Sequence, residues 1–264
     1  MNKIRRPSEG TAPRVVLIGL ASCFGCQINI TNIEAHLLEV LGQIDMAYWQ
    51  LTSSDPMPDA FDVAVIEGAV TTEEAAATVR AARERARCVI AIGACAATGG
   101  IPGMAADDLA AHSARVYGDA APRACGAMRA PVPVSAVVDV DFTVPCCPID
   151  PFQFVRVLDA ALYGSNRLEA TSVLCGECKR NERGCFFQDG TLCLGLVTRS
   201  GCGAKCPALG RPCNGCAGLS PDGNVRAARF VAARSGMEVR RFDEALAMFN
   251  AVALAAADEE GGNR

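Results

Sequence analysis

The sequence predicts an α/β protein in which a doubly wound parallel sheet precedes a small, irregular, cysteine-rich domain with helices at its C-terminal end. In the first part of the chain, short apolar runs alternate with segments of helical spacing, which is typical of a parallel sheet. From Cys175 to Cys216 the chain is rich in glycine and cysteine and has no apolar periodicity. Helical spacing then returns. We therefore expect two domains, residues 1–165 and 166–264, divided by a change in composition near 164–170.

The first predicted elements are a strand, a turn and a helix. The continuous apolar run Arg14–Leu20 is expected of a strand that is buried on both faces. It leads into a turn with Cys23 and Cys26, after which apolar residues recur at helical spacing over residues 27–41. The two cysteines are therefore expected at the carboxyl end of a strand, where open α/β sheets place their ligand sites.

The same alternation continues along the first domain. Apolar runs predict further strands at residues 44–51, 61–69, 88–95 and 137–144. Helices are predicted at residues 71–87, with Glu73 and Glu74 at the positive N-terminal end, at 151–162, and beyond the cysteine-rich segment at 224–235 and 241–257. Residues 104–134 show no clear period and receive no assignment. The order of elements predicts a sheet of the flavodoxin type.

Cysteines recur where predicted strands end. Cys95 closes one strand, and the adjacent Cys146 and Cys147 follow another. Together with Cys23 and Cys26, Cys95 and one cysteine of this pair are expected to meet at one edge of the sheet. Four thiolates are the ligand count of one 4Fe–4S cluster. In the alternative interpretation each is an inert buried residue, since free cysteine is among the most buried residue types.

The cysteine-rich segment divides into two sets of four cysteines, at positions 175, 178, 185, 193, 202, 206, 213 and 216. Because this segment cannot bury enough apolar surface to order itself, groups bonded to the sulfurs are expected to order it. Disulfides are one alternative, but cytosolic thiols are kept reduced. Structural zinc also takes four thiolates, but it would leave the cysteines of the first domain without a role. Iron–sulfur clusters are the favoured interpretation.

Composition narrows the class of partner. The chain has 264 residues, a formal net charge of -4 and 5% aromatic residues, which argues against a nucleic-acid partner. No stretch approaches the ~18–20 apolar residues that span a bilayer. Arg5 and Arg6 are adjacent, but no apolar export region follows them, so a cytoplasmic location is expected.

The sequence offers no site for bond-making chemistry. It has neither the dinucleotide-binding glycine motif nor a phosphate-binding loop motif. Neither His36 nor His112 has a partner that would form a catalytic pair. Since each cluster accepts and passes one electron, the chain is expected to conduct electrons while a partner subunit holds the reactive centre.

These motifs resemble the small, electron-transfer subunits of nickel–iron hydrogenases. In that family a strand leads into a C-x-x-C turn, here Cys23–Cys26. A G-x-C turn followed by two glycines corresponds to Gly93–Cys95 with Gly99–Gly100. The segment Ile66–Val70 also resembles the family's strand end near the proximal cluster.

A GCPP-like turn of the family corresponds to Cys146, Cys147 and Pro148. The family's ligand is the cysteine immediately before proline, and Cys146 replaces the usual glycine. The resemblance therefore implies a proximal cluster on Cys23, Cys26, Cys95 and Cys147.

The cysteine-rich segment resembles the same family. The run CLGLVTRSGC, which begins at Cys193, is similar to the family's link between distal and medial clusters. The resemblance implies a distal cluster on Cys175, Cys178, Cys185 and Cys193, and a medial cluster on Cys202, Cys206, Cys213 and Cys216. Many periplasmic members have histidine in place of Cys175 and lack a fourth medial cysteine. This sequence has all eight, which implies three 4Fe–4S clusters and the cytoplasmic branch, most like the delta subunit of NAD(P)-linked hydrogenases or sulfhydrogenases.

The resemblance also implies partners. A large subunit would hold the nickel–iron centre, and diaphorase-like subunits with flavin and further iron–sulfur centres would pass electrons to NADP or NAD. No catalytic residue would belong to this chain, although it would be a subunit of an oxidoreductase. The alternatives are a small subunit of an F420- or heterodisulfide-linked hydrogenase, a hydrogen-sensing subunit, and a zinc-stabilised interaction module.

Overall fold

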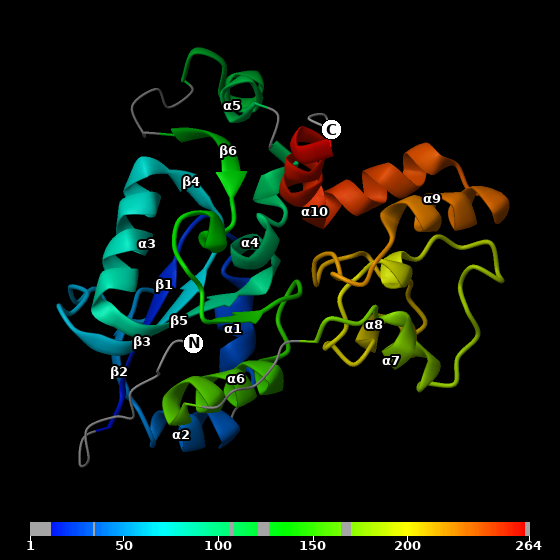
Figure 1. The fold of residues 1–264 in the computed structure, drawn as a ribbon. Coiled ribbons are helices and arrows are strands. Elements are labelled where there is room, and N and C mark those ends of the chain that lie inside the picture. The colour runs from blue at the N-terminus through cyan, green and yellow to red at the C-terminus, as the bar shows by residue number, and fades with distance from the viewer. Residues whose placement is uncertain (1–11, 34, 106–107, 121–126, 165–169, 262–264) are drawn as a thin grey trace. The chain divides into compact units, whose positions relative to one another are not determined.

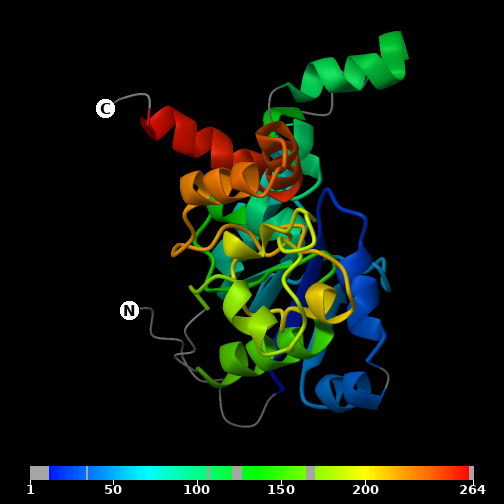
Figure 2. The same ribbon diagram turned by 90° about the vertical axis from the view of Figure 1, so that its right-hand side faces the viewer.

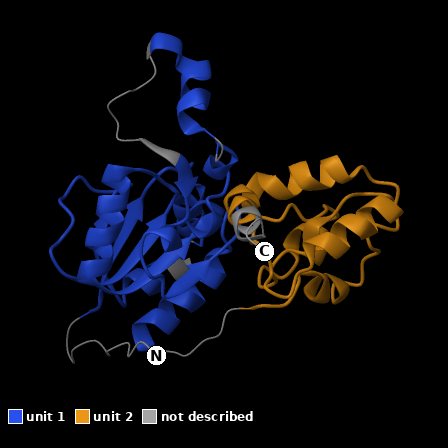
Figure 3. Cartoon of the chain, turned by 45° about the horizontal axis from the view of Figure 1, so that its top comes forward, with its two compact units in different colours: residues 1–167 blue, residues 168–264 orange. Residues whose placement is uncertain are grey.

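A computed structural model describes residues 12–33, 35–105, 108–120, 127–164 and 170–261. The predicted domain boundary, near residues 164–170, lies mostly outside the described residues. The chain divides into two compact units, residues 1–167 and 168–264, which are coloured separately in Figure 3.

A five-stranded sheet forms the centre of the first unit (Figure 1). Its strand order is β2-β1-β3-β5-β7, and every neighbouring pair is parallel. The strands are β1 (Arg14–Gly19), β2 (Asp45–Trp49), β3 (Phe61–Glu67), β5 (Ala86–Ile92) and β7 (Phe142–Val144). This is the doubly wound order of flavodoxin-like sheets, in which ligands bind beyond the carboxyl ends of the strands. The predicted α/β fold is confirmed.

Both faces of the sheet are buried because helices cover each of them. Alternate residues of β1, β3 and β5 pack against α1 (Gly25–Thr31) and α6 (Pro151–Tyr163) on one face. The intervening residues pack against α3 (Glu73–Arg85) on the other. This two-sided burial explains why the strands are continuous apolar runs in the sequence.

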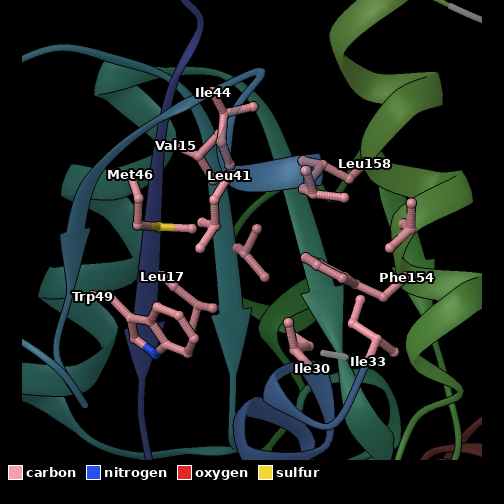
Figure 4. Close-up of a pocket in the computed structure, with 13 residues that line it drawn as sticks. Val15, Leu17, Ile30, Ile33, Leu41, Ile44, Met46, Trp49, Phe154 and Leu158 are labelled. Carbon is pink, nitrogen blue, oxygen red and sulfur yellow. The ribbon is translucent and has the colours of Figure 1, made fainter. Parts of the chain in front are cut away.

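Figure 4 shows the packing that fixes α1 and α6. Phe154 and Leu158 of α6, Ile30 of α1, and Leu17 and Trp49 of the sheet line a cavity of only ≈ 10 Å³. A space of this size has room for about one water molecule. This region is therefore a close-packed core, and it holds α1 through Ile30 in the last turn of that helix.

Two predicted elements are shorter than expected. The helix predicted at 27–41 is two helices, α1 and α2 (Ala35–Leu41), because Thr31 and Asn32 bond back to Ile28 and Asn29 and end the first one. The strand predicted at 137–144 is only β7, because the Asp141 carboxylate accepts the Val89 amide before the ladder begins.

The segment 104–134, which showed no period, contains regular structure. It includes part of the 3₁₀ turn η1 (Pro102–Ala105), α5 (Leu109–Tyr117), the 3₁₀ turn η2 (Gly118–Ala120), β6 (Ala127–Val132) and the start of η3 (Val134–Ala136). The strand β6 pairs antiparallel with β4 (Val70–Thr72) in a separate two-stranded sheet. Helix α5 buries none of its residues, and Figures 1 and 2 show it standing apart from the main sheet.

The second unit combines short helices in the cysteine-rich segment with two longer ones after it. Its elements are α7 (Cys175–Lys179), η4 (Leu194–Leu196), α8 (Lys205–Ala208), α9 (Val225–Arg234) and α10 (Val239–Gly261). Phe242 and Leu246 of α10 are fully buried and pack with Ala228 and Ala232 of α9 against Leu194. No helix in the described part of the chain is both long and apolar enough to cross a membrane.

Candidate iron–sulfur cluster sites

Four cysteines lie beyond the carboxyl ends of the parallel strands β1, β5 and β7, and we call them the edge set: Cys23, Cys26, Cys95 and Cys147. Cys23 and Cys26 follow β1, and Cys147 follows β7. Cys95 does not end β5 as predicted. It lies in α4 (Gly93–Thr98), because Gly93 has a φ of 81° and turns the chain out of the strand.

The pKa values of two thiols in the edge set depend on the charges of the other two. Burial raises the pKa of Cys26, and the nearby charges of Glu67 and Cys147 raise it further. Burial also raises the pKa of Cys95, with added contributions from the charges of Cys23 and Glu67. Cys26 is therefore affected by Cys147, and Cys95 is affected by Cys23. Binding of iron requires these thiols to lose their protons. The positive charge of the iron then offsets the repulsion between the thiolates.

Glu67 is a buried carboxylate at the centre of this edge, with a relative exposure of 1%. Its Oε1 accepts a hydrogen bond from the Cys26 amide over 3.1 Å, and its Oε2 accepts one from the Gln27 amide over 3.3 Å. The carboxylate therefore holds the first turn of α1, where amides have no partner within the helix. The sequence motifs assigned no role to Glu67. A carboxylate at the end of the mostly apolar strand β3 was the available signal.

A glycine makes room for the Cys26 sulfur. A Cβ atom at Gly93 would lie 2.6 Å from Cys26 Sγ, and the positive φ of this residue is one that side chains rarely adopt. The backbone of β5 can therefore approach the cysteine only because residue 93 lacks a side chain.

The adjacent cysteines Cys146 and Cys147 differ in their surroundings. Cys147 is exposed, and its charge affects Cys26. Cys146 is buried, has a φ of 93°, and its carbonyl accepts the Ala94 amide over 2.8 Å. Cys146 thus takes a backbone conformation suited to glycine and links the turn after β7 to α4.

In the second unit, two cysteines lie in α7 and two follow it in the chain. We call these four the first loop set: Cys175, Cys178, Cys185 and Cys193. Burial raises the pKa of Cys175, followed by the charges of Cys193, Cys178 and Cys185. Burial also raises the pKa of Cys178, and the charges of Cys193 and Cys185 add to this. All four thiols therefore take part in one group of interacting charges.

The remaining four form the second loop set: Cys202, Cys206, Cys213 and Cys216. Burial raises the pKa of Cys206, and the charges of Cys216 and Cys202 add to this. Burial also raises the pKa of Cys213 to about 12, while hydrogen bonds with Gly215 and Thr198 oppose the rise. Cys213 is 7% exposed and is the most enclosed thiol of the set.

The two loop sets touch at Cys193. Its Sγ accepts a hydrogen bond from the backbone amide of Cys213 over 3.2 Å. A Cβ atom at Gly195 would lie 3.6 Å from Cys175 Sγ, 3.7 Å from Cys193 Sγ and 3.9 Å from Cys213 Cβ. The hydrogen bond between Cys193 and Cys213 thus joins one member of each set.

Two side chains outside the cysteine sets support the loops. The carboxylate of Glu177 accepts the amides of Gly201 and Gly203, each over 2.9 Å, and so ties α7 to the turn that carries Cys202. The fully buried Asn250 of α10 donates to the Gly215 carbonyl over 3.4 Å. Sequence spacing could not reveal these contacts, because each joins residues more than twenty positions apart.

Cys88 lies apart from these sets, in the core of the first unit. It is 1% exposed, and burial raises its pKa to about 12. In the described part of the chain, no group of three or more His, Cys, Asp or Glu side chains is arranged to hold a single metal ion. A 4Fe–4S cluster binds each of its four thiolates through a different iron atom.

Comparison with known proteins places the chain in a family. The family model described as NADH ubiquinone oxidoreductase, 20 Kd subunit, matches residues 23–161. A subunit of the F420-non-reducing hydrogenase vhu of Methanocaldococcus jannaschii is 31% identical, and the match covers 92% of this chain and 95% of that protein. The sulfhydrogenase 2 subunit delta of Pyrococcus furiosus is 36% identical, over 78% of this chain and 86% of the relative.

A solved structure supports the same relationship. The chain matches a subunit in a crystal structure of an NAD⁺-reducing [NiFe]-hydrogenase with a TM-score of 0.53 and 27% identity. The match covers 58% of this chain and 92% of that one. The chain therefore belongs to the family described as NADH ubiquinone oxidoreductase, 20 Kd subunit, and within it to the small subunits of nickel–iron hydrogenases.

Proposed function

We propose that this chain is the electron-transfer small subunit of a cytoplasmic nickel–iron hydrogenase and that it holds three 4Fe–4S clusters. The proximal cluster is assigned to the edge set, the distal cluster to the first loop set and the medial cluster to the second loop set. The single observation that carries the proposal is that, in each set, the charge of another cysteine of the same set raises the pKa of two members: Cys26 and Cys95, Cys175 and Cys178, and Cys206 and Cys213. Four thiolates are the ligands that one such cluster takes.

The chain's own residues hold thiolates, exclude water and donate hydrogen bonds to sulfur. When bound, each cluster accepts and releases one electron. Gly93 leaves room for Cys26 Sγ, and Glu67 fixes the turn that presents it. The Gly215 amide donates to Cys213 Sγ over 3.4 Å. Such contacts, together with burial, set the potential at which a cluster is reduced.

The proposed partners follow from the relatives. A large subunit holds the nickel–iron centre that splits hydrogen, and the edge set faces it. Electrons leave through the loop sets to diaphorase-like flavin and iron–sulfur subunits and then to NAD or NADP. The similarity to a subunit of the NAD⁺-reducing enzyme supports this acceptor. A cytoplasmic location suits the proposal, because cytosolic thiols are kept reduced.

One observation favours a second candidate acceptor. The Methanocaldococcus relative belongs to an F420-non-reducing hydrogenase, and its match extends over 92% of this chain. The alternative is therefore a hydrogenase linked to another acceptor, such as a heterodisulfide, through a different partner subunit. The clusters and their ligands would be the same in both cases.

The test is H2-dependent electron transfer in the purified native complex, with NAD, NADP, F420 and heterodisulfide as acceptors. Reduction of NAD or NADP supports the first candidate, and reduction of heterodisulfide alone supports the second. Cys95→Ser should abolish transfer while about eight irons per chain remain in the loop sets. Cys88→Ala, which removes a core thiol, should keep the full iron content. Normal transfer by Cys95→Ser would contradict the assignment of the edge set.

A further inference from the structure

Thr198 is a buried side chain beside a proposed cluster ligand. It follows η4, is 1% exposed, and its Oγ1 lies 3.5 Å from the Sγ of Cys213. Its backbone carbonyl accepts the Leu174 amide over 2.8 Å, which fixes the residue in place. The hydroxyl therefore has a defined position next to the most enclosed thiol of the second loop set.

The hydroxyl proton has two possible acceptors. With Cys213 protonated, the thiol donates to Thr198 Oγ1, and Thr198 Oγ1 donates to the Leu194 carbonyl over 2.7 Å. That carbonyl also accepts the backbone amides of Val197 and Thr198, each over 3.1 Å. A carbonyl oxygen has two lone pairs. Leu194 therefore keeps its full complement of hydrogen bonds without the hydroxyl.

Binding of iron changes this arrangement. A ligand cysteine is a thiolate, which has no proton to donate and can only accept. The Thr198 hydroxyl rotates freely about its Cβ–Oγ1 bond, and turning it toward Cys213 leaves no buried acceptor without a partner. The charged sulfur is then the stronger of the two acceptors.

We propose that the Thr198 hydroxyl donates a hydrogen bond to the Cys213 thiolate and thereby raises the reduction potential of the cluster on the second loop set. This inference rests on the proposed function, because it requires a cluster on Cys213. Thr198 acts as a positioning residue through the ligand and is not itself a ligand.

The direction of the effect follows from charge. Reduction adds one negative charge to the cluster and its sulfurs, so a donor to sulfur stabilises the reduced form more than the oxidised form. The site is enclosed, with Cys213 only 7% exposed, so water has little access to replace a lost donor. The Gly215 amide remains as a second donor over 3.4 Å, so removal of the hydroxyl weakens the stabilisation without abolishing it.

The test is a potentiometric titration of the native complex, followed by electron paramagnetic resonance, in three variants. Thr198→Val removes the hydroxyl and nearly keeps the shape, Thr198→Ser keeps the hydroxyl, and Thr191→Val is a control at an exposed threonine of the same unit. In Thr198→Val we expect one of the three cluster potentials to fall, with a roughly tenfold shift toward the oxidised form, or about 59 mV for one electron. Thr198→Ser and Thr191→Val should match the wild type.

A second readout uses the wild-type complex in D2O and does not depend on any variant folding. Deuterium electron–nuclear double resonance of the reduced protein should show exchangeable deuterons from amide donors and a further hydroxyl deuteron, and Thr198→Val should lose only the hydroxyl deuteron. The inference is overturned if the wild-type protein lacks a hydroxyl deuteron at the second loop set. It is also overturned if all three potentials are unchanged in Thr198→Val, or if Thr198→Ser shifts as far as Thr198→Val. A complex without three cluster signals in the wild type would instead defeat the proposed function.

Discussion

Glu67 at the end of β3 accepts a hydrogen bond from the amide of Cys26 across 41 positions of sequence. The contact joins β3 to α1, the helix that follows the neighbouring parallel strand β1, at the edge where Cys23, Cys95 and Cys147 also lie. The geometry of the first C-x-x-C motif therefore depends on a buried carboxylate that accepts hydrogen bonds from backbone amides. The local sequence of the turn does not determine it alone.

Replacing Glu67 should therefore damage both stability and cluster binding. Glu67→Ala leaves the amides of Cys26 and Gln27 without this acceptor, and one such buried donor costs about 1–3 kcal/mol. We expect a lower free energy of unfolding in urea and fewer irons per chain. Glu67→Gln, which keeps an acceptor oxygen and the side-chain volume, should lose less of both. Wild-type stability and iron content in Glu67→Ala would show that the turn does not need the carboxylate.

Gly93→Ala should remove the proximal cluster. The new methyl group would lie 2.6 Å from Cys26 Sγ, at a backbone φ of 81°. Gly236→Ala is the matched control, because Gly236 has a φ of 79° and no atom within 4 Å of its Cβ position. Both variants carry the strain of a positive φ, about 1–3 kcal/mol, but only the first has the clash. Iron analysis should give about eight irons in Gly93→Ala and about twelve in Gly236→Ala. Equal iron contents would argue against a site at Cys26.

Substitutions at Cys146 and Cys147 should differ in their effect on the iron content. Cys147→Ser should lose about four irons, the content of one cluster. Cys146→Gly should keep all of its iron and unfold at a higher urea concentration, because glycine adopts a φ of 93° without strain. Loss of iron in Cys146→Gly, with retention in Cys147→Ser, would reverse the assignment of the fourth ligand.

The sequence predicted the parts of the fold whose burial follows a local pattern. The strands at 14–19, 61–67 and 86–92 are apolar runs buried on both faces, so their positions and the sheet edge beyond them were predictable. The pairing of β4 with β6 was not, because it joins short segments with little periodicity that are far apart in sequence. The break after Thr31 depends on side chains that bond to their own helix, which apolar spacing does not detect.

The candidate sites, like the fold, were predictable from the sequence only in part. Strand ends predicted that Cys23, Cys26, Cys95 and one of Cys146 and Cys147 share a set. The choice of Cys147 and the membership of the two loop sets came from the family resemblance, and all three groupings stay predictions until the clusters are measured. The roles of Glu67, Glu177 and Thr198 were not predictable, because each depends on a contact between residues brought together by the fold. The carboxylate of Glu67 at the end of a mostly apolar strand was a signal, but the sequence does not show which amides it accepts.

Cys88 should make stability fall at alkaline pH. Its pKa is raised from 9.0 to about 12 in the folded chain, first by burial and then by the charge of Asp141. A raised pKa gives a contribution that is fully present below pH 9 and is lost as the pH rises toward 12. Between pH 8 and pH 10 this loss is about 1.4 kcal/mol. Urea unfolding of the wild type and Cys88→Ala should show a difference in stability that changes by this amount. A difference that does not vary with pH would mean that the thiol ionises as easily in the folded chain as in the unfolded one.

The central claim is that twelve thiolates hold three 4Fe–4S clusters. Its most direct test is the iron, acid-labile sulfide and zinc content of the anaerobically purified complex, corrected for the metals of its partner subunits and combined with Mössbauer spectra. The proposal predicts about twelve irons and twelve sulfides per chain in three 4Fe–4S environments. A chain with two or three zinc ions and no acid-labile sulfide, in a complex that still transfers electrons, would contradict it.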